Sequence, residues 1–146
     1  MAAVSEPLTV RDTGMRWEPA PDLHARMARI VQVLGFSHVN PARVHCLRVY
    51  GARPNAWARI WGLPRVFQEA LGIPPAYVVE FVCPAFDRLP QGEQDRVMIH
   101  ELLHIPTTFS GAVRPERSRG MRIDRKTVER YYRRYRQVAA SSPGGP

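Results

Sequence analysis

The fold of this chain is decided by the stretch Val97-Met-Ile-His-Glu-Leu-Leu-His-Ile-Pro106. His100 and His104 are four residues apart, so in a helix their side chains lie on one face, with Cβ atoms roughly 5–6 Å apart. The apolar residues of the stretch lie opposite that face or flank it: Met98, Ile99, Leu102, Leu103 and Ile105. The sequence therefore predicts a helix that is buried on most sides and open on the side of the two histidines.

The residues His100-Glu-Leu-Leu-His104 form the His-Glu-x-x-His pattern of zinc metallopeptidases. Two imidazoles on one helical face can converge on one ion, at Zn–N distances of about 2.0–2.1 Å. Glu101 lies about 100° around the helix from His100, where its carboxylate can take a proton from an attacking water molecule. The competing interpretation is an ordinary core helix with two incidental histidines, and the register of all three polar residues on the open face disfavours it.

The composition indicates one soluble globular domain. The 146 residues are 45% hydrophobic and 23% charged, and we expect a domain over 21–140 between an N-terminal arm (1–20) and a flexible tail (141–146). No apolar run approaches the ~18 residues of a membrane span, and the N-terminus lacks the pattern of a signal peptide. Cys46 and Cys83 are the only cysteines, which excludes a disulfide framework. These features predict a cytoplasmic protein.

Hydrophobic periodicity predicts an alternation of helices and strands. The expected helices are 23–34, 55–61, 64–71 and a last helix from about Asp124, and the expected strands are 43–50 and 76–83. Trp57 and Trp61 are interpreted as core residues. The strand at 77–83 is expected to offer an edge along which an extended peptide pairs, with Glu80 solvated at that edge.

One metal ligand must come from outside the motif, because a catalytic zinc usually takes three protein ligands. The metzincin pattern requires a histidine at position 110, where this chain has Ser110, so that class is excluded. No histidine follows His104, which leaves three carboxylates: Glu116 in a loop, Asp124 at the start of the last helix and Glu129 within it. A His₂Glu site is ordinary for hydrolytic zinc, and spacing alone leaves all three open.

Three stretches of the chain resemble the phage-type metallopeptidase family of bacteria, archaea and phages. They are Ala58-Arg-Ile-Trp-Gly-Leu-Pro-Arg-Val-Phe-Gln-Glu-Ala-Leu-Gly-Ile-Pro-Pro-Ala-Tyr-Val-Val-Glu80, Phe86-Asp87 and Ile99-His-Glu-Leu-Leu-His-Ile-Pro-Thr-Thr-Phe-Ser-Gly-Ala-Val-Arg-Pro115. The similarity covers roughly residues 43–136, far more than the five-residue motif. It implies a zinc-dependent peptidase acting on a peptide or protein substrate, distantly similar to SprT-type proteases. The expected architecture is an α+β, zincin-like single domain, with a small sheet covered by the helices at 23–34 and 55–71 and the motif helix beneath it.

Members of the family usually carry a histidine directly after the Arg-Pro pair, where this chain has Glu116. We expect Glu116 to replace that ligand; Glu129 as the ligand, or weakened metal binding with Glu116 as a solvated loop carboxylate, are the alternatives. The predicted site therefore comprises His100, His104 and Glu116 as ligands of Zn²⁺, with Glu101 as the general base.

The basic character of the chain is concentrated near its C-terminus. Residues 111–146 carry 10 basic and 3 acidic side chains, whereas residues 1–110 carry 11 and 10. The cations of the last helix, interleaved with three tyrosines, could contact phosphates and stack on bases: Arg122, Arg125, Lys126, Arg130, Arg133, Arg134 and Arg136. A nucleic-acid-binding protein with a degenerate or structural metal site is therefore the alternative function. A solvated helix face over an aromatic core stripe explains the same pattern without a partner.

Overall fold

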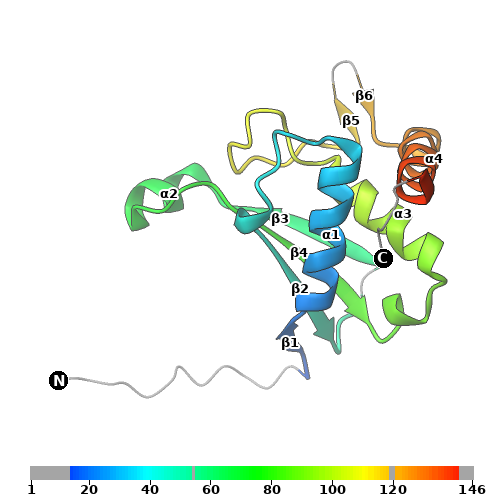
Figure 1. Cartoon of the computed structure of the whole chain (residues 1–146). Helices are drawn as coiled ribbons and strands as arrows, with labels where there is room; N and C mark the ends of the chain where they lie inside the picture. The colour runs from blue at the N-terminus through cyan, green and yellow to red at the C-terminus, as the bar shows by residue number, and fades with distance from the viewer. Residues whose placement is uncertain (1–13, 54, 119–120, 142–146) are drawn as a thin grey trace.

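The computed structural model describes residues 14–53, 55–118 and 121–141 of the chain (Figure 1). Four strands form one mixed sheet in the order β1-β2-β4-β3, in which β2 and β4 are parallel and the two outer pairs are antiparallel. The strands are β1 (Arg16–Pro19), β2 (Val44–Tyr50), β3 (Ala58–Gly62) and β4 (Tyr77–Cys83). The architecture is α+β, as the sequence predicted.

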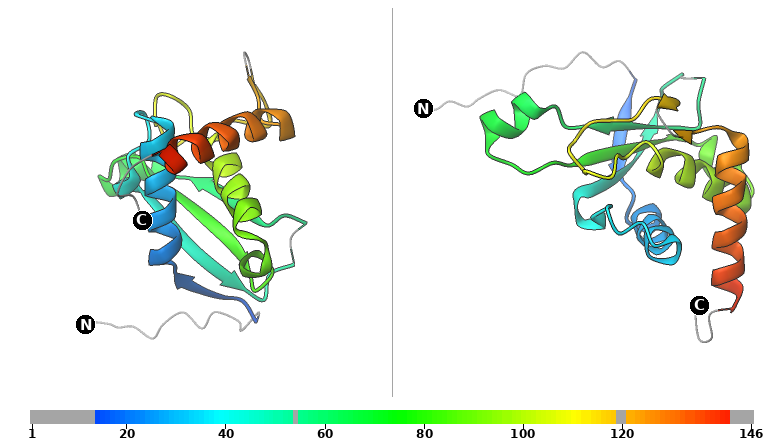
Figure 2. Two further views of the ribbon diagram at one scale, coloured as in Figure 1. Left: turned by 45° about the vertical axis from the view of Figure 1, so that its right-hand side comes forward. Right: turned by 90° about the horizontal axis from the view of Figure 1, so that it is seen from above.

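Three of the four α-helices of the described chain lie on one side of this sheet, and α2 extends away from it (Figure 2). Two short 3₁₀ helices and a small hairpin complete the fold. The helices are α1 (Pro21–Leu34), α2 (Arg65–Leu71), α3 (Gln91–Leu102), α4 (Arg125–Ser141), η1 (Pro41–Arg43) and η2 (Phe86–Arg88), and the hairpin strands are β5 (Arg117–Ser118) and β6 (Met121–Arg122). The hairpin begins directly after Glu116, which the sequence analysis had placed in a loop. Among the described residues, no helix has the length and apolarity needed to cross a membrane.

The core lies between the sheet and α1, α3 and α4. Strand β4 alternates as expected, and its inward residues Tyr77, Val79 and Phe81 are buried in the core cluster. The apolar side of α3 joins the same cluster through Met98 and Leu102. The motif helix is therefore held by packing on its apolar side, as its sequence pattern predicted.

The predicted helix at 55–61 is wrong, because Ala58–Gly62 forms strand β3. This strand pairs with β4 from Ala58↔Phe81 to Gly62↔Tyr77. Trp57 and Trp61 are 48% and 54% exposed, so neither is a core residue. The apolar residues of α2 are exposed as well, and the expected covering of the sheet by 55–71 is also wrong.

The predicted edge at 77–83 is wrong too, because β4 lies between β2 and β3. Glu80 is only 5% exposed, and its carboxylate accepts hydrogen bonds from the indole N–H groups of Trp17 and Trp61 and from Arg59. Burial alone would raise the pKa of Glu80, but these bonds and the Arg59 charge hold it below its ordinary value. Glu80 thus joins β1, β3 and β4 on the sheet face opposite the helices, rather than lying solvated at an edge.

Candidate metal centre

The motif helix α3 is held by polar contacts at its N-terminal end. Arg26 of α1 donates hydrogen bonds to Gln94 (2.6 Å) and to the carboxylate of Asp95 (2.7 Å). The amide of Gln94 in turn donates to the carbonyl oxygens of Phe86 and Leu89, in the segment that leads into α3. Since these groups are buried or half-buried, the bonds fix where α3 begins relative to α1.

The two motif histidines lie at the C-terminal end of α3. The helix ends at Leu102, and His104 lies in the following turn, where its N–H donates to the carbonyl of Glu101 (3.1 Å). The ring centroids of His100 and His104 are 5.2 Å apart. Although the last turn is tightened, His100 and His104 remain neighbours on one face, as the i, i+4 spacing of the motif requires.

The segment after Pro106 is anchored to β4 by one buried hydroxyl. Tyr77 accepts a hydrogen bond from the N–H of Gly111 and donates one to the carbonyl of Ala112, both at 2.8 Å. Its ring also contacts Phe109 edge-on, with centroids 5.0 Å apart. Gly111 has a φ of +93°, in the left-handed region that favours glycine. These contacts turn the loop back toward α3.

The loop then returns to His104 through Arg114. The backbone N–H of Arg114 donates to the His104 carbonyl (2.7 Å), and the Arg114 carbonyl is hydrogen-bonded to Nδ1 of the His104 ring. Because a carbonyl oxygen only accepts, Nδ1 carries the proton and Nε2 keeps its lone pair. A backbone carbonyl that orients a histidine in this way is a common partner of metal-binding imidazoles.

Glu116 completes the cluster two residues later. Its Oε1 lies 3.0 Å from Nε2 of His100 and 3.3 Å from Nε2 of His104, and all three candidate ligand atoms lie within 4.8 Å of one another. Two ligand atoms about 2.0–2.1 Å from zinc, at tetrahedral angles, are themselves roughly 3.3 Å apart. The spacing and the two-nitrogen, one-carboxylate donor set therefore fit a zinc ion.

The other two predicted carboxylates are engaged elsewhere. Glu129 accepts a hydrogen bond from Arg96 at 2.8 Å. Asp124 caps α4 by accepting bonds from the backbone N–H and the hydroxyl of Thr127, both at 2.9 Å. Of the three alternatives, the structure brings only Glu116 to the histidines.

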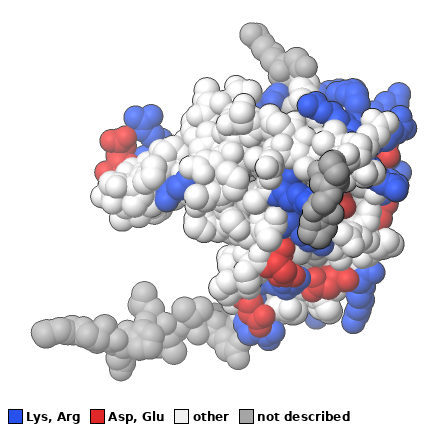
Figure 3. Space-filling model, in the orientation of Figure 1, with Lys and Arg blue, Asp and Glu red and all other residues white. Residues whose placement is uncertain are grey.

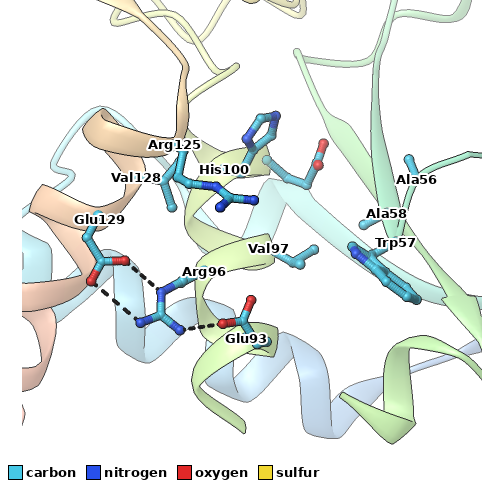
Figure 4. Close-up of a pocket in the computed structure, with 11 residues that line it drawn as sticks. Ala56, Trp57, Ala58, Glu93, Arg96, Val97, His100, Arg125, Val128 and Glu129 are labelled. Atoms are coloured by element: carbon cyan, nitrogen blue, oxygen red, sulfur yellow. Dashed lines mark hydrogen bonds and ion pairs between the residues drawn. The ribbon is translucent and has the colours of Figure 1, made fainter. Parts of the chain in front are cut away.

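Glu101 lines a cavity of about 380 Å³. The side chain of Glu101 is buried, and burial raises its pKa to about 8, with a further contribution from the negative charge of Glu116. His100 and Glu101 line the cavity together with Trp57, which directly precedes β3, and Arg125 from α4 (Figure 4). The candidate base thus has open space beside it.

Three residues of the site were not singled out from the sequence as metal-site residues. Tyr77 was placed only in the expected strand at 76–83. Arg114 acts through its backbone carbonyl and N–H groups, and a pattern of side chains does not reveal such a role. Arg125 was one of seven basic residues between positions 122 and 136, and the sequence did not distinguish it from the others. The string Thr-Phe-Ser-Gly-Ala-Val-Arg-Pro, shared with the family, is the one signal that pointed to the loop.

The tyrosines of α4 pack inward rather than outward. Tyr132 belongs to the core cluster and lies under the guanidinium of Arg96, 4.1 Å from its ring centroid. Tyr131 contacts Phe36 edge-on, and Tyr135 packs against the core. These contacts favour the aromatic core stripe over the alternative in which the three tyrosines stack on bases.

Comparison with known proteins gives one result. No curated protein and no solved structure matches the chain. The family described as "Putative phage metallopeptidase" matches residues 15–140, which include α3, the returning loop and α4. The chain therefore belongs to this phage metallopeptidase family.

Proposed function

We propose that the protein is a zinc-dependent peptidase with a zincin-like active site. The observation that carries this proposal is the convergence of His100, His104 and Glu116, together with the cavity that His100 and Glu101 line. A bound Zn²⁺ would act as a Lewis acid on the scissile carbonyl and lower the pKa of water in the site.

Glu101 acts as the general base in this proposal. Its carboxylate takes the proton of the attacking water and then gives it to the leaving amine. The buried surroundings of Glu101 suit this role, because they raise its pKa and so make its carboxylate a stronger base.

The substrate backbone is proposed to pair with the edge strand β3. This strand is outermost in the sheet, and Ala58 at its start lines the same cavity as His100 and Glu101. An extended peptide added to that edge gains backbone hydrogen bonds without regard to its side chains. In this arrangement the peptide runs past Glu101. Strand β3 then has the substrate-pairing role that the sequence analysis had assigned to residues 77–83.

Glu101→Gln tests the proposal. The amide has nearly the shape of the carboxylate but cannot take a proton, so cleavage of a casein substrate falls by roughly 10²–10⁴-fold. Zinc content per chain stays that of the wild type, because Glu101 is not a ligand. A variant that keeps its activity would remove Glu101 from the role of base, and a zinc-loaded wild type that cleaves no peptide bond would contradict the proposed function.

Binding of nucleic acid through α4 is the second candidate, and exposed arginines favour it. Basic side chains gather on the side of the molecule where α4 lies (Figure 3). Arg130, Arg133 and Arg134 are exposed, and Glu129 is the one acidic residue on that helix. Contact with several phosphates predicts a steep loss of affinity with salt, and each contact removed by Arg→Gln lowers the slope by roughly 0.9. Binding that does not respond to salt would exclude this function.

A further inference from the structure

The cavity beside Glu101 contains two arginines in different electrostatic states. Arg96 is neutralised, because its guanidinium bonds to Glu129 (2.8 Å) and to Glu93 (2.8 Å). Arg125 projects from α4 into the cavity near His100 (Figure 4), and no carboxylate among the described residues lies within ion-pair distance of it. The cavity therefore offers one cation whose charge the protein itself leaves unbalanced.

The remaining walls near Arg125 are largely apolar. Trp57 stands across from it with Val97 between them, and Val128 lines the cavity on the α4 side (Figure 4). Glu93 and Glu129 are both bonded to Arg96, and Glu101, the third carboxyl group of the lining, forms no ion pair with Arg125 among the described residues. A ligand that fits must bury a short apolar stem and end in a negative charge, which describes a glutamate or aspartate side chain.

We propose that this cavity is a substrate subsite selecting an acidic side chain next to the scissile bond, with Arg125 as the specificity residue. The inference rests on the proposed peptidase function, since the scissile bond is placed by the metal cluster and Glu101. A lysine at the same position would lie beside the unpaired guanidinium of Arg125 and is disfavoured relative to a glutamate.

Cleavage of matched peptides tests the specificity. In peptides that differ only by Glu, Gln or Lys at each position flanking the scissile bond, kcat/KM for the best Glu peptide exceeds that for its Gln counterpart by roughly tenfold. Arg125→Met brings this ratio close to one, and Arg125→Glu shifts the preference to Lys. The matched control is Arg134→Met, an exposed arginine of the same helix that does not line the cavity.

Two kinetic results would overturn the proposal. The wild type could cleave Glu and Gln peptides equally well. Alternatively, Arg125→Met could slow both peptides by the same factor, which would mean that the guanidinium stabilises the transition state rather than a side chain.

A binding measurement separates failure of the subsite from failure of the peptidase. N-acetyl-glutamate N-methylamide is titrated into the metal-free protein while the indole N–H resonance of Trp57 is followed, assigned with Trp57→Phe. The resonance shifts with Glu and much less with the glutamine analogue, and the difference disappears in Arg125→Met. Equal shifts with both ligands would overturn the subsite even if the enzyme is active, whereas a Glu-specific shift in a protein that cleaves nothing supports the subsite and contradicts the peptidase.

Discussion

Removing the hydroxyl of Tyr77 breaks the two hydrogen bonds that tie strand β4 to the loop that carries Glu116. In Tyr77→Phe the N–H of Gly111 loses its acceptor in a buried setting, while the carbonyl of Ala112 is exposed and can turn to water. An unpaired buried donor costs about 1–3 kcal/mol, and a hydrogen bond exchanged for water costs about 0.5–1.5 kcal/mol. The variant therefore loses roughly 1.5–4.5 kcal/mol of unfolding free energy, a large share of the ~5–15 kcal/mol of a typical domain.

The same change weakens zinc binding. Glu116 follows the part of the loop that turns at Gly111 and is tied to His104 through Arg114, although its own carbonyl also accepts a hydrogen bond from the N–H of Ile123. Loss of a group that orients a ligand commonly lowers metal affinity by roughly 10–100-fold, and competition with a fluorescent chelator measures this. Tyr135→Phe, a half-buried tyrosine of α4, is the control and changes neither property. An unfolding free energy within about 0.5 kcal/mol of the wild type would refute the hydrogen bonds, and a large stability loss with unchanged zinc affinity would refute the link to Glu116.

Two further predictions concern the scaffold. Because the folded-state pKa of Glu80 lies below its ordinary value of 4.5, its contribution to stability is present above pH 4.5 and is lost as the pH falls through the lower folded value. In Glu80→Gln the unfolding free energy, measured with urea at a series of pH values, should therefore fall less steeply below pH 4.5 than in the wild type. An identical decrease in both proteins would contradict the assigned bonds. Asp124→Ala removes the cap of α4 and costs about 1 kcal/mol, whereas Asp124→Asn keeps most of it; equal unfolding midpoints for the alanine variant and the wild type would show that the cap contributes nothing.

The motif helix was predictable because local rules and tertiary packing agree there. Its apolar residues recur with helical spacing, and the structure buries them while His100 stays half-exposed. Strand β4 was predictable for the same reason, since its alternation of side chains is what the core uses. Glu116 came from the resemblance to the family and from the absence of a later histidine, not from periodicity.

The predictions for strand β3 and for Glu80 were wrong because the environment of both is set by residues distant in sequence. The stretch Ala58–Gly62 is short, and with the preceding Trp57 its Ile60 and Trp61 follow a helical spacing, so the sequence resembles a core helix until β4 provides the pairing partner. Glu80 looks like a solvated charge until Trp17 and Trp61 supply hydrogen-bond donors from 63 and 19 residues away. Neither partnership leaves a mark in the local sequence.

The most direct test of the metal centre is the zinc content of three purified proteins: the wild type, Glu116→Ala and Glu129→Ala. Elemental analysis after dialysis against a weak chelator gives zinc per chain, and circular dichroism checks that each protein is folded. We predict one zinc per chain in the wild type and in Glu129→Ala, because Glu129 is bonded to Arg96, and little zinc in Glu116→Ala. The reverse order for the two variants, or a folded wild type that binds no zinc when it is supplied, would contradict the site described here.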